Sequence, residues 1–143
     1  KRESMSKLQT LTPNSIKNII YSDMFTDFSR HVNTGELNTK TNEEAVKQSV
    51  RNLLMTNHYE RLFHPEIGSG LTGMLFENFT PVTHKRYENY IKEVFDKFEP
   101  RADLVGLQIS PNIDGNAIAI TVHFKIKNLG TQTSLQLLLE RTR

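Results

Sequence analysis

The residues best suited to chemistry in this chain are three carboxylates, Glu66, Glu77 and Glu99. Two carboxylates that flank a sugar can hydrolyse a glycosidic bond if their separation is right and one of them has a raised pKa. Each also has an ordinary structural role, because Glu66 lies in a Pro/Gly turn, Glu77 ends a predicted short helix and Glu99 adjoins a helix end. Nothing in the sequence places two of them on one cleft, so the pattern favours the structural roles and assigns no catalytic residue.

Metal and nucleotide patterns are equally weak. The five histidines share no metal-ligand spacing, and we expect no metal site from them: His31, His58, His64, His84 and His123. Glycines 68, 70 and 73 form G-x-G-x-x-G, but that motif needs a preceding strand and a nucleotide-binding βαβ unit, and "HPEI" precedes it here. We interpret Gly68 and Gly70 as residues that give the backbone the conformational freedom to enter a helix through a tight turn, and we expect no cofactor.

Composition narrows the remaining classes. The 143 residues suffice for one domain with its own core, and the absence of cysteine removes disulfides and thiolate chemistry and fits an intracellular birthplace. The 18 basic and 16 acidic side chains give a formal charge of +2 with no basic block, so nucleic acid is not an expected partner. No apolar run is long enough to span a bilayer, and we expect no membrane partner.

Three helices are predicted in the middle of the chain. Thr41 and Glu44 have capping-box spacing, and the apolar residues behind them recur on one face of a helix of about four turns: Val46, Val50, Leu53 and Leu54. A short helix carries Leu71, Met74 and Leu75. Thr80 and Pro81 then form a cap-then-proline signal before the longest helix, whose apolar stripe comprises Tyr87, Ile91, Val94, Phe95 and Phe98.

After Arg101 the apolar period changes from 3.6 to 2, which predicts three strands. The alternating apolar residues are Val105, Leu107 and Ile109, then Ile118, Ile120, Val122, Phe124 and Ile126, then Leu135, Leu137 and Leu139. We therefore predict an α+β fold, with amphipathic helices packed on a C-terminal three-stranded antiparallel meander whose last strand is a free edge.

The N-terminal part differs in composition from the rest. Residues 1–40 are rich in Ser, Thr and Asn, with apolar residues in small groups, and we interpret them as an extended arm before a domain at 41–143. Within the arm, Thr12 and Pro13 predict a short helical turn that runs through Ile16 to Ile20.

The tripeptide Glu99, Pro100 and Arg101 lies where the long helix meets the sheet and has two interpretations. The two charges could form a knob for a partner. Alternatively, Pro100 ends the helix and the charges remain solvated. The residues alone favour neither.

The order of these features resembles the GPW/gene-25-like family of contractile-tail baseplate proteins. The resemblance rests on "FHPEIGSGL", on "LFENFTPVT", on the long helix that ends in Phe98, Glu99, Pro100 and Arg101, and on the sheet that follows. "YSD" at 21–23 also looks like the start of the wedge subunit of T-even-type myophages. The family includes TssE, the corresponding component of bacterial type VI secretion systems.

The resemblance implies a structural wedge subunit, not an enzyme, that joins the baseplate core to the first sheath layer in multiple copies. Its expected partners are other baseplate wedge proteins and the tail sheath protein, and its expected place is the virion tail baseplate, after synthesis in the host cytoplasm. The expected partner-binding residues are the EPR motif and the last strand: Glu99, Pro100, Arg101, Ser134, Gln136, Leu138 and Glu140. A lysozyme-like peptidoglycan hydrolase and a TssE-type component in the bacterial cytoplasm are the alternatives.

The stretch "RLFHPEIGSGLTGMLFENFTP" at 61–81 is then an entry turn and a connector between helices. Its apolar residues are predicted to lock the helices together and to shape an assembly surface: Phe63, Ile67, Leu71, Leu75, Phe76 and Phe79. If Phe79 is fully buried, its replacement by Ala should cost about 3–5 kcal/mol.

Overall fold

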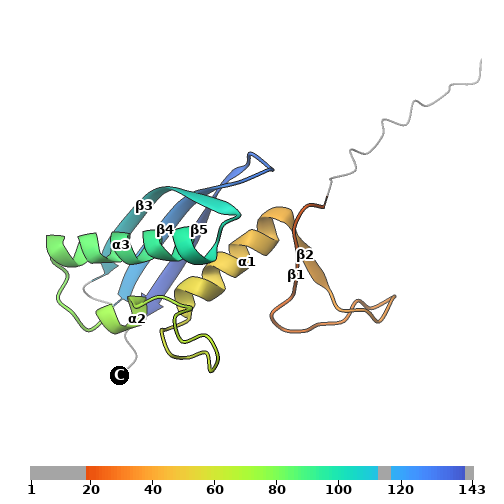
Figure 1. The fold of residues 1–143 in the computed structure, drawn as a ribbon, viewed down its shortest axis with the longest axis horizontal. Coiled ribbons are helices and arrows are strands. Elements are labelled where there is room, and N and C mark those ends of the chain that lie inside the picture. Colours follow the sequence, from red (N-terminus) through yellow and green to blue (C-terminus); the bar gives the residue numbers. More distant parts are fainter. Residues whose placement is uncertain (1–18, 113–116, 141–143) are drawn as a thin grey trace, which may run out of the picture.

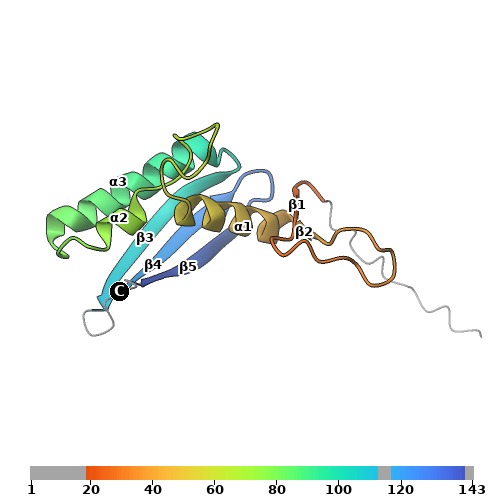
Figure 2. The ribbon, with the colours of Figure 1, turned by 90° about the horizontal axis from the view of Figure 1, so that it is seen from below.

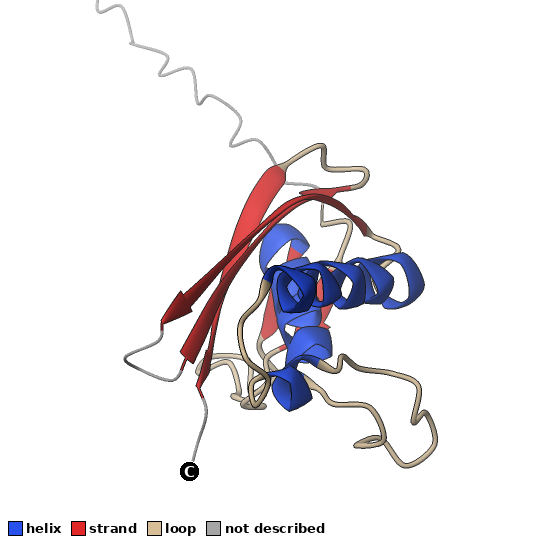
Figure 3. Cartoon of the chain, turned by 90° about the vertical axis from the view of Figure 1, so that its left-hand side faces the viewer, coloured by secondary structure: helices blue, strands red, loops and turns tan. Residues whose placement is uncertain are grey.

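The computed structural model describes residues 19–112 and 117–140. Its elements follow in the order β1 (Ser22–Met24), β2 (Thr39–Thr41), α1 (Asn42–Met55), α2 (Leu71–Met74), α3 (Pro81–Phe98), β3 (Ala102–Asn112), β4 (Ala117–Ile126) and β5 (Gln132–Glu140). The last three strands form an antiparallel sheet in the order β3-β4-β5, and the helices cover one of its faces (Figures 1 and 3). The predicted α+β architecture is confirmed.

The two long helices begin where the sequence predicts, for different local reasons. At α3 the Thr80 hydroxyl accepts a hydrogen bond from the backbone N–H of Thr83 at 3.2 Å, and Pro81 follows the cap, as predicted. At α1 the Thr41 side chain, at the end of β2, makes no capping hydrogen bond, so the cap predicted from the spacing of Thr41 and Glu44 is wrong. Asn42 takes φ +50°, which asparagine tolerates, and its side-chain oxygen accepts from the backbone N–H of Ile20 at 2.9 Å.

The core fills the space between the helices and the sheet. Four residues of the predicted α3 stripe are buried, while Phe98 at the end of the helix is only partly buried. The Phe95 and Phe124 rings pack with their centres 5.6 Å apart, which joins α3 to the central strand. All five apolar residues predicted to face inward from β4 are buried. The helical and strand periods of the sequence therefore predicted correctly which faces of α3 and β4 pack in the core.

One strand residue was assigned to the wrong face. Val105 was predicted to point inward with Leu107 and Ile109, but its side chain is 55% exposed. The pairing of β3 with β4 shifts between Leu104 and Gly106, so Val105 is an extra residue in a β-bulge. The bulge reverses the alternation, and Leu104 rather than Val105 packs against the core.

The stretch at 61–81 is also less buried than predicted. Leu71 and Leu75 are buried and Ile67 packs against the core, as expected. Phe63, Phe76 and Phe79, however, are 90%, 65% and 38% exposed, so the prediction that they lock the helices together is wrong. These three rings lie outside α1, α2 and α3, where no helical period directs a side chain toward the sheet.

Residues 19–41, which we call the N-terminal excursion, form a two-stranded antiparallel ladder. β1 and β2 pair antiparallel, and a bridge between Arg30 and Leu37 continues the ladder outward. Figure 2 shows this excursion projecting from the start of α1, away from the sheet. The turn predicted at residues 12–20 lies largely outside the described residues, and the domain boundary at residue 40 stays a prediction. No helix within 19–112 or 117–140 has the length and apolarity needed to cross a membrane.

Candidate functional site

The EPR motif at the end of α3 is built around a buried carboxylate. The Glu99 side chain is 1% exposed, and its two oxygens accept hydrogen bonds from the Arg101 guanidinium at 2.6 and 3.0 Å. Pro100 between them is exposed and Arg101 is half-buried. The hydrogen bond from Arg101 to Glu99 raises the pKa of the guanidinium. The interpretation in which both charges stay solvated is therefore wrong, because Glu99 is withdrawn from water and paired.

The same arginine holds the start of the N-terminal excursion. Its guanidinium lies 3.5 Å from an Asp23 carboxylate oxygen and stacks 5.6 Å from the centre of the Tyr21 ring. The Tyr21 hydroxyl accepts from the Asn128 amide at 3.0 Å, in the turn between β4 and β5. "YSD" and "EPR", separated by more than 70 residues in the chain, are thus two parts of one cluster.

The geometry limits how the EPR motif can meet a partner. Glu99 has both oxygens engaged and almost no exposed surface, so it cannot reach another chain directly. Pro100 and the exposed quarter of the Arg101 side chain, 27%, are what the motif offers at the surface. Sequence reasoning noted both YSD and EPR but did not connect them, because the contact depends on how the excursion folds back onto the domain.

The last strand presents the predicted free edge. Within residues 19–112 and 117–140, β5 pairs with β4 on one side only and ends the sheet order. Thr133, Leu137 and Leu139 are buried, and the Thr133 hydroxyl donates to a Glu43 carboxylate oxygen of α1 at 2.6 Å. The predicted partner-binding residues lie on the opposite, exposed face of the strand: Ser134, Gln136, Leu138 and Glu140. The outer main chain of β5 is therefore available for a further strand.

Each candidate catalytic carboxylate is ion-paired or hydrogen-bonded to a neighbouring side chain. Glu77 pairs with Arg86 at 3.1 Å on the surface, and Glu99 is buried against Arg101. Glu66 contacts the His64 ring at 3.1 Å, and its own backbone N–H together with that ring lowers the pKa of its carboxyl. Glu77 and Glu99 are each paired with an arginine, and the lowered pKa of Glu66 is the opposite of the raised pKa that a general acid needs at neutral pH.

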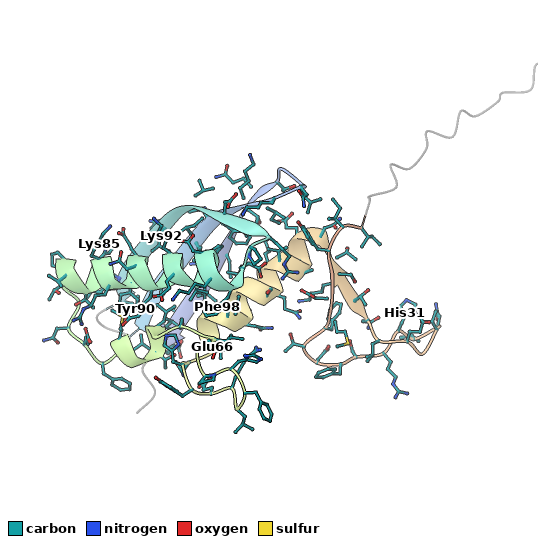
Figure 4. The ribbon with its side chains drawn as sticks, in the orientation of Figure 1. His31, Glu66, Lys85, Tyr90, Lys92 and Phe98 are labelled. Carbon is teal, nitrogen blue, oxygen red and sulfur yellow. The ribbon has the colours of Figure 1, made fainter. Side chains whose placement is uncertain are left out.

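A second carboxylate does share a cavity with Glu66. Glu66 and Glu93 line a space of about 140 Å³ between α3 and the loop that precedes α2, together with Tyr90, Lys97 and other side chains (Figure 4). Lys97 lowers the pKa of the Glu93 carboxyl by hydrogen bonding to it. Both carboxyls are thus held as anions, whereas an acid and base pair needs one of them to keep its proton.

No site for a metal ion emerges in the described part of the chain. Within 19–112 and 117–140, no group of three or more His, Asp or Glu side chains converges in a way that could hold a metal. Among the described residues the site combines an exposed strand edge, a buried ion pair and an anchored excursion.

The sequence from residue 40 to residue 130 matches the family of baseplate wedge protein gp25. The chain belongs to this family. The gp25 baseplate wedge protein of Enterobacteria phage T4 is 28% identical over 109 residues, which cover 76% of this chain and 82% of that relative. This gp25-family chain also resembles several solved structures.

A protein from Geobacter sulfurreducens with the provisional name tail lysozyme is 26% identical and superposes with a TM-score of 0.64, over 71% of this chain and 92% of that one. A chain of the anti-feeding prophage baseplate is 24% identical, with a TM-score of 0.60 over 86% and 87% of the two chains. A chain of the post-contracted pyocin R2 baseplate is 18% identical, with a TM-score of 0.51 over 80% and 98%. The last two likenesses concern the fold alone.

Proposed function

We propose that this gp25-family chain is a wedge subunit that links the baseplate core of a contractile injection machine to the first layer of its sheath. Membership of the family makes the chain a structural baseplate component of such a machine. The finer assignment concerns how it binds: a strand of a neighbouring chain adds to β5, and Pro100 with Arg101 contacts the wedge core. Partners are other baseplate proteins and the sheath protein, in multiple copies per particle.

The observation that carries this proposal is the open edge of β5. The strand is nine residues long, pairs with β4 alone among the described strands, and is held against α1 through Thr133 and Glu43. Long unpaired edges are hazards that isolated proteins usually block with proline, bulges or dense charge, and residues 132–139 contain no charged residue and no proline. An added strand would satisfy the outer backbone groups through main-chain hydrogen bonds.

The enzymatic alternative has less support. The name of the Geobacter protein points to a tail lysozyme, and a hydrolase of that type needs two carboxyls of different pKa beside a sugar. In this chain the Glu66 and Glu93 carboxyls share a small cavity but both have lowered pKa values. We therefore propose that the chain is not an enzyme. If the chain is instead a component of a TssE-type secretion baseplate, it would bind its partners through the same surfaces, and only the surrounding machine would differ.

The test is assembly with the products of the adjacent genes, measured by co-expression, affinity purification and native mass determination. The key variant is Leu138→Lys on β5, and the matched control is Val105→Lys on β3, since both side chains are 55% exposed on edge strands. We expect both variants to fold, and only Leu138→Lys to lose the complex. Normal assembly by Leu138→Lys would contradict strand addition at β5.

A further inference from the structure

The loop between α1 and α2 exposes three large apolar side chains close together. Tyr59, Leu62 and Phe63 are 85%, 94% and 90% exposed. Single exposed apolar residues are common on protein surfaces, but three within five residues form a concentrated patch that marks an interaction site in a soluble protein. None of the contacts described for the β5 edge or the EPR motif uses these residues.

Hydrogen bonds close the base of this loop. The Ser69 backbone N–H donates to the Thr56 carbonyl at 2.7 Å, and its buried hydroxyl donates to the Leu54 carbonyl at 2.6 Å. Higher up, the Tyr59 backbone N–H donates to the Pro65 carbonyl at 2.9 Å. The loop is therefore tied across its width at two levels.

Gly68 makes this close approach possible. Its φ is +138°, a conformation that L side chains rarely adopt, and a Cβ added there would lie 2.6 Å from the Thr56 carbonyl oxygen. The two ends of the loop thus pass each other in backbone contact. Only glycine permits this contact, so the loop has a defined shape.

The carboxylates of the loop are used to brace it. Glu60 accepts hydrogen bonds from the Asn57 backbone N–H at 2.9 Å and from its side-chain amide at 2.7 Å. Glu66 contacts His64 at 3.1 Å. Glu60 and Glu66 therefore bind within the loop, while Tyr59, Leu62 and Phe63 remain exposed.

We propose that Tyr59, Leu62 and Phe63 form an anchor patch that inserts into an apolar pocket on a neighbouring baseplate protein. The inference rests on the proposed function and adds a contact to it. Aromatic and aliphatic anchors held by a braced loop lose little conformational freedom on binding, which is the property of residues that dominate protein interfaces. Figures 2 and 3 show the loop on the helix side of the molecule, away from the sheet. The chain would then hold partners at two separate places.

The charge of the loop favours a protein over a bilayer as the partner. Residues 57–67 contain two glutamates and one arginine, a formal charge of −1 with neutral histidines. The Asn57 backbone N–H and side-chain amide lower the pKa of Glu60. The Glu66 backbone N–H, together with His64, lowers the pKa of Glu66, so both carboxyls stay ionised at neutral pH. Surface segments that bind anionic lipids are rich in Lys and Arg instead.

The experiment compares the wild-type chain with two double variants in the same co-expression with adjacent gene products. Leu62→Ser/Phe63→Ser removes the anchors, and Leu62→Met/Phe63→Tyr keeps their apolar character. Since both positions are exposed, we expect both variants to unfold at the wild-type midpoint. We expect the serine variant to bind at least about tenfold more weakly, with little change for the conservative variant.

Four outcomes would overturn the inference in distinguishable ways. Wild-type affinity of the serine variant would refute the patch while leaving the proposed function intact. No complex with the wild-type chain would refute the proposed function and the patch together. Loss of a homodimer in place of a mixed complex would make a second copy the partner. Flotation of the wild-type chain, but not of the serine variant, with phosphatidylcholine and phosphatidylglycerol vesicles would make a membrane the partner.

Discussion

Removing the Arg101 guanidinium should destabilise the isolated domain strongly. In Arg101→Met the Glu99 carboxylate, 1% exposed, would lose both of its side-chain hydrogen bonds and its only ion-pair partner in the described chain. Breaking a buried ion pair from one side typically costs about 3–5 kcal/mol, because a desolvated charge remains. The contacts of Arg101 with Asp23 and Tyr21 are half-exposed and add about 1 kcal/mol together. We therefore expect a loss of about 4–6 kcal/mol.

The assay is urea unfolding followed by circular dichroism, with the free energy of unfolding obtained from the midpoint and slope. Lys97→Met is the matched control, because Lys97 pairs with Glu93 on the exposed side of α3, and we expect less than about 1 kcal/mol from it. Glu99→Gln/Arg101→Met leaves no charge buried and should recover most of the loss. If Arg101→Met costs no more than Lys97→Met, the Glu99–Arg101 pair does not stabilise the end of α3 as argued.

Three further predictions concern residues 57–81, between α1 and the start of α3. Gly68→Ala should cost at least about 2 kcal/mol, because the residue has a positive φ and the new Cβ would clash with the Thr56 carbonyl oxygen. The control Gly73→Ala, whose Cβ would meet open space in α2, should be neutral or slightly stabilising. Equal urea midpoints for the two variants would contradict this prediction. Phe79→Ala should cost only about 1–2 kcal/mol, since the ring is 38% exposed and packs edge-on against His84, and a loss of 3 kcal/mol or more would show that it is buried. The Glu60 carboxyl should titrate below its ordinary pKa of 4.5 in carboxyl NMR, and its pKa should return toward that value in Asn57→Ala. The stabilising effect of the Glu60 carboxylate is present above pH 4.5 and is lost as the pH falls through the lowered pKa. An unchanged titration in Asn57→Ala would refute the bond between the Asn57 side chain and Glu60.

The elements of the fold follow from local patterns in the sequence. The Thr80–Pro81 cap, the stripe on α3 and the alternation in β4 all depend on neighbours within a few positions, and all three were predicted correctly. Val105 was misplaced because a bulge adds one residue to a strand without changing its apolar composition. Phe63 was misplaced because an aperiodic loop gives no indication of which side chains point inward.

The site was harder to predict than the fold, because it depends on tertiary contacts. Glu99 was identified as a boundary residue, but its burial follows from how the turn after α3 folds the Arg101 side chain back over it. The contact of Arg101 with Asp23 and Tyr21 joins two segments that no spacing rule relates. The free edge of β5 was predictable, since a meander that ends in an apolar strand leaves that strand unpaired on one side.

Strand addition at β5 is best tested by amide hydrogen exchange of this strand in the free chain and in the purified baseplate complex. We expect the backbone amides of Gln132–Glu140 that do not bond to β4 to exchange rapidly in the free chain. In the complex they should be protected at least about tenfold, through bonds to an added strand. The amides on the outer edge of β3 serve as the internal reference. Unchanged exchange along β5 in an intact complex would contradict strand addition.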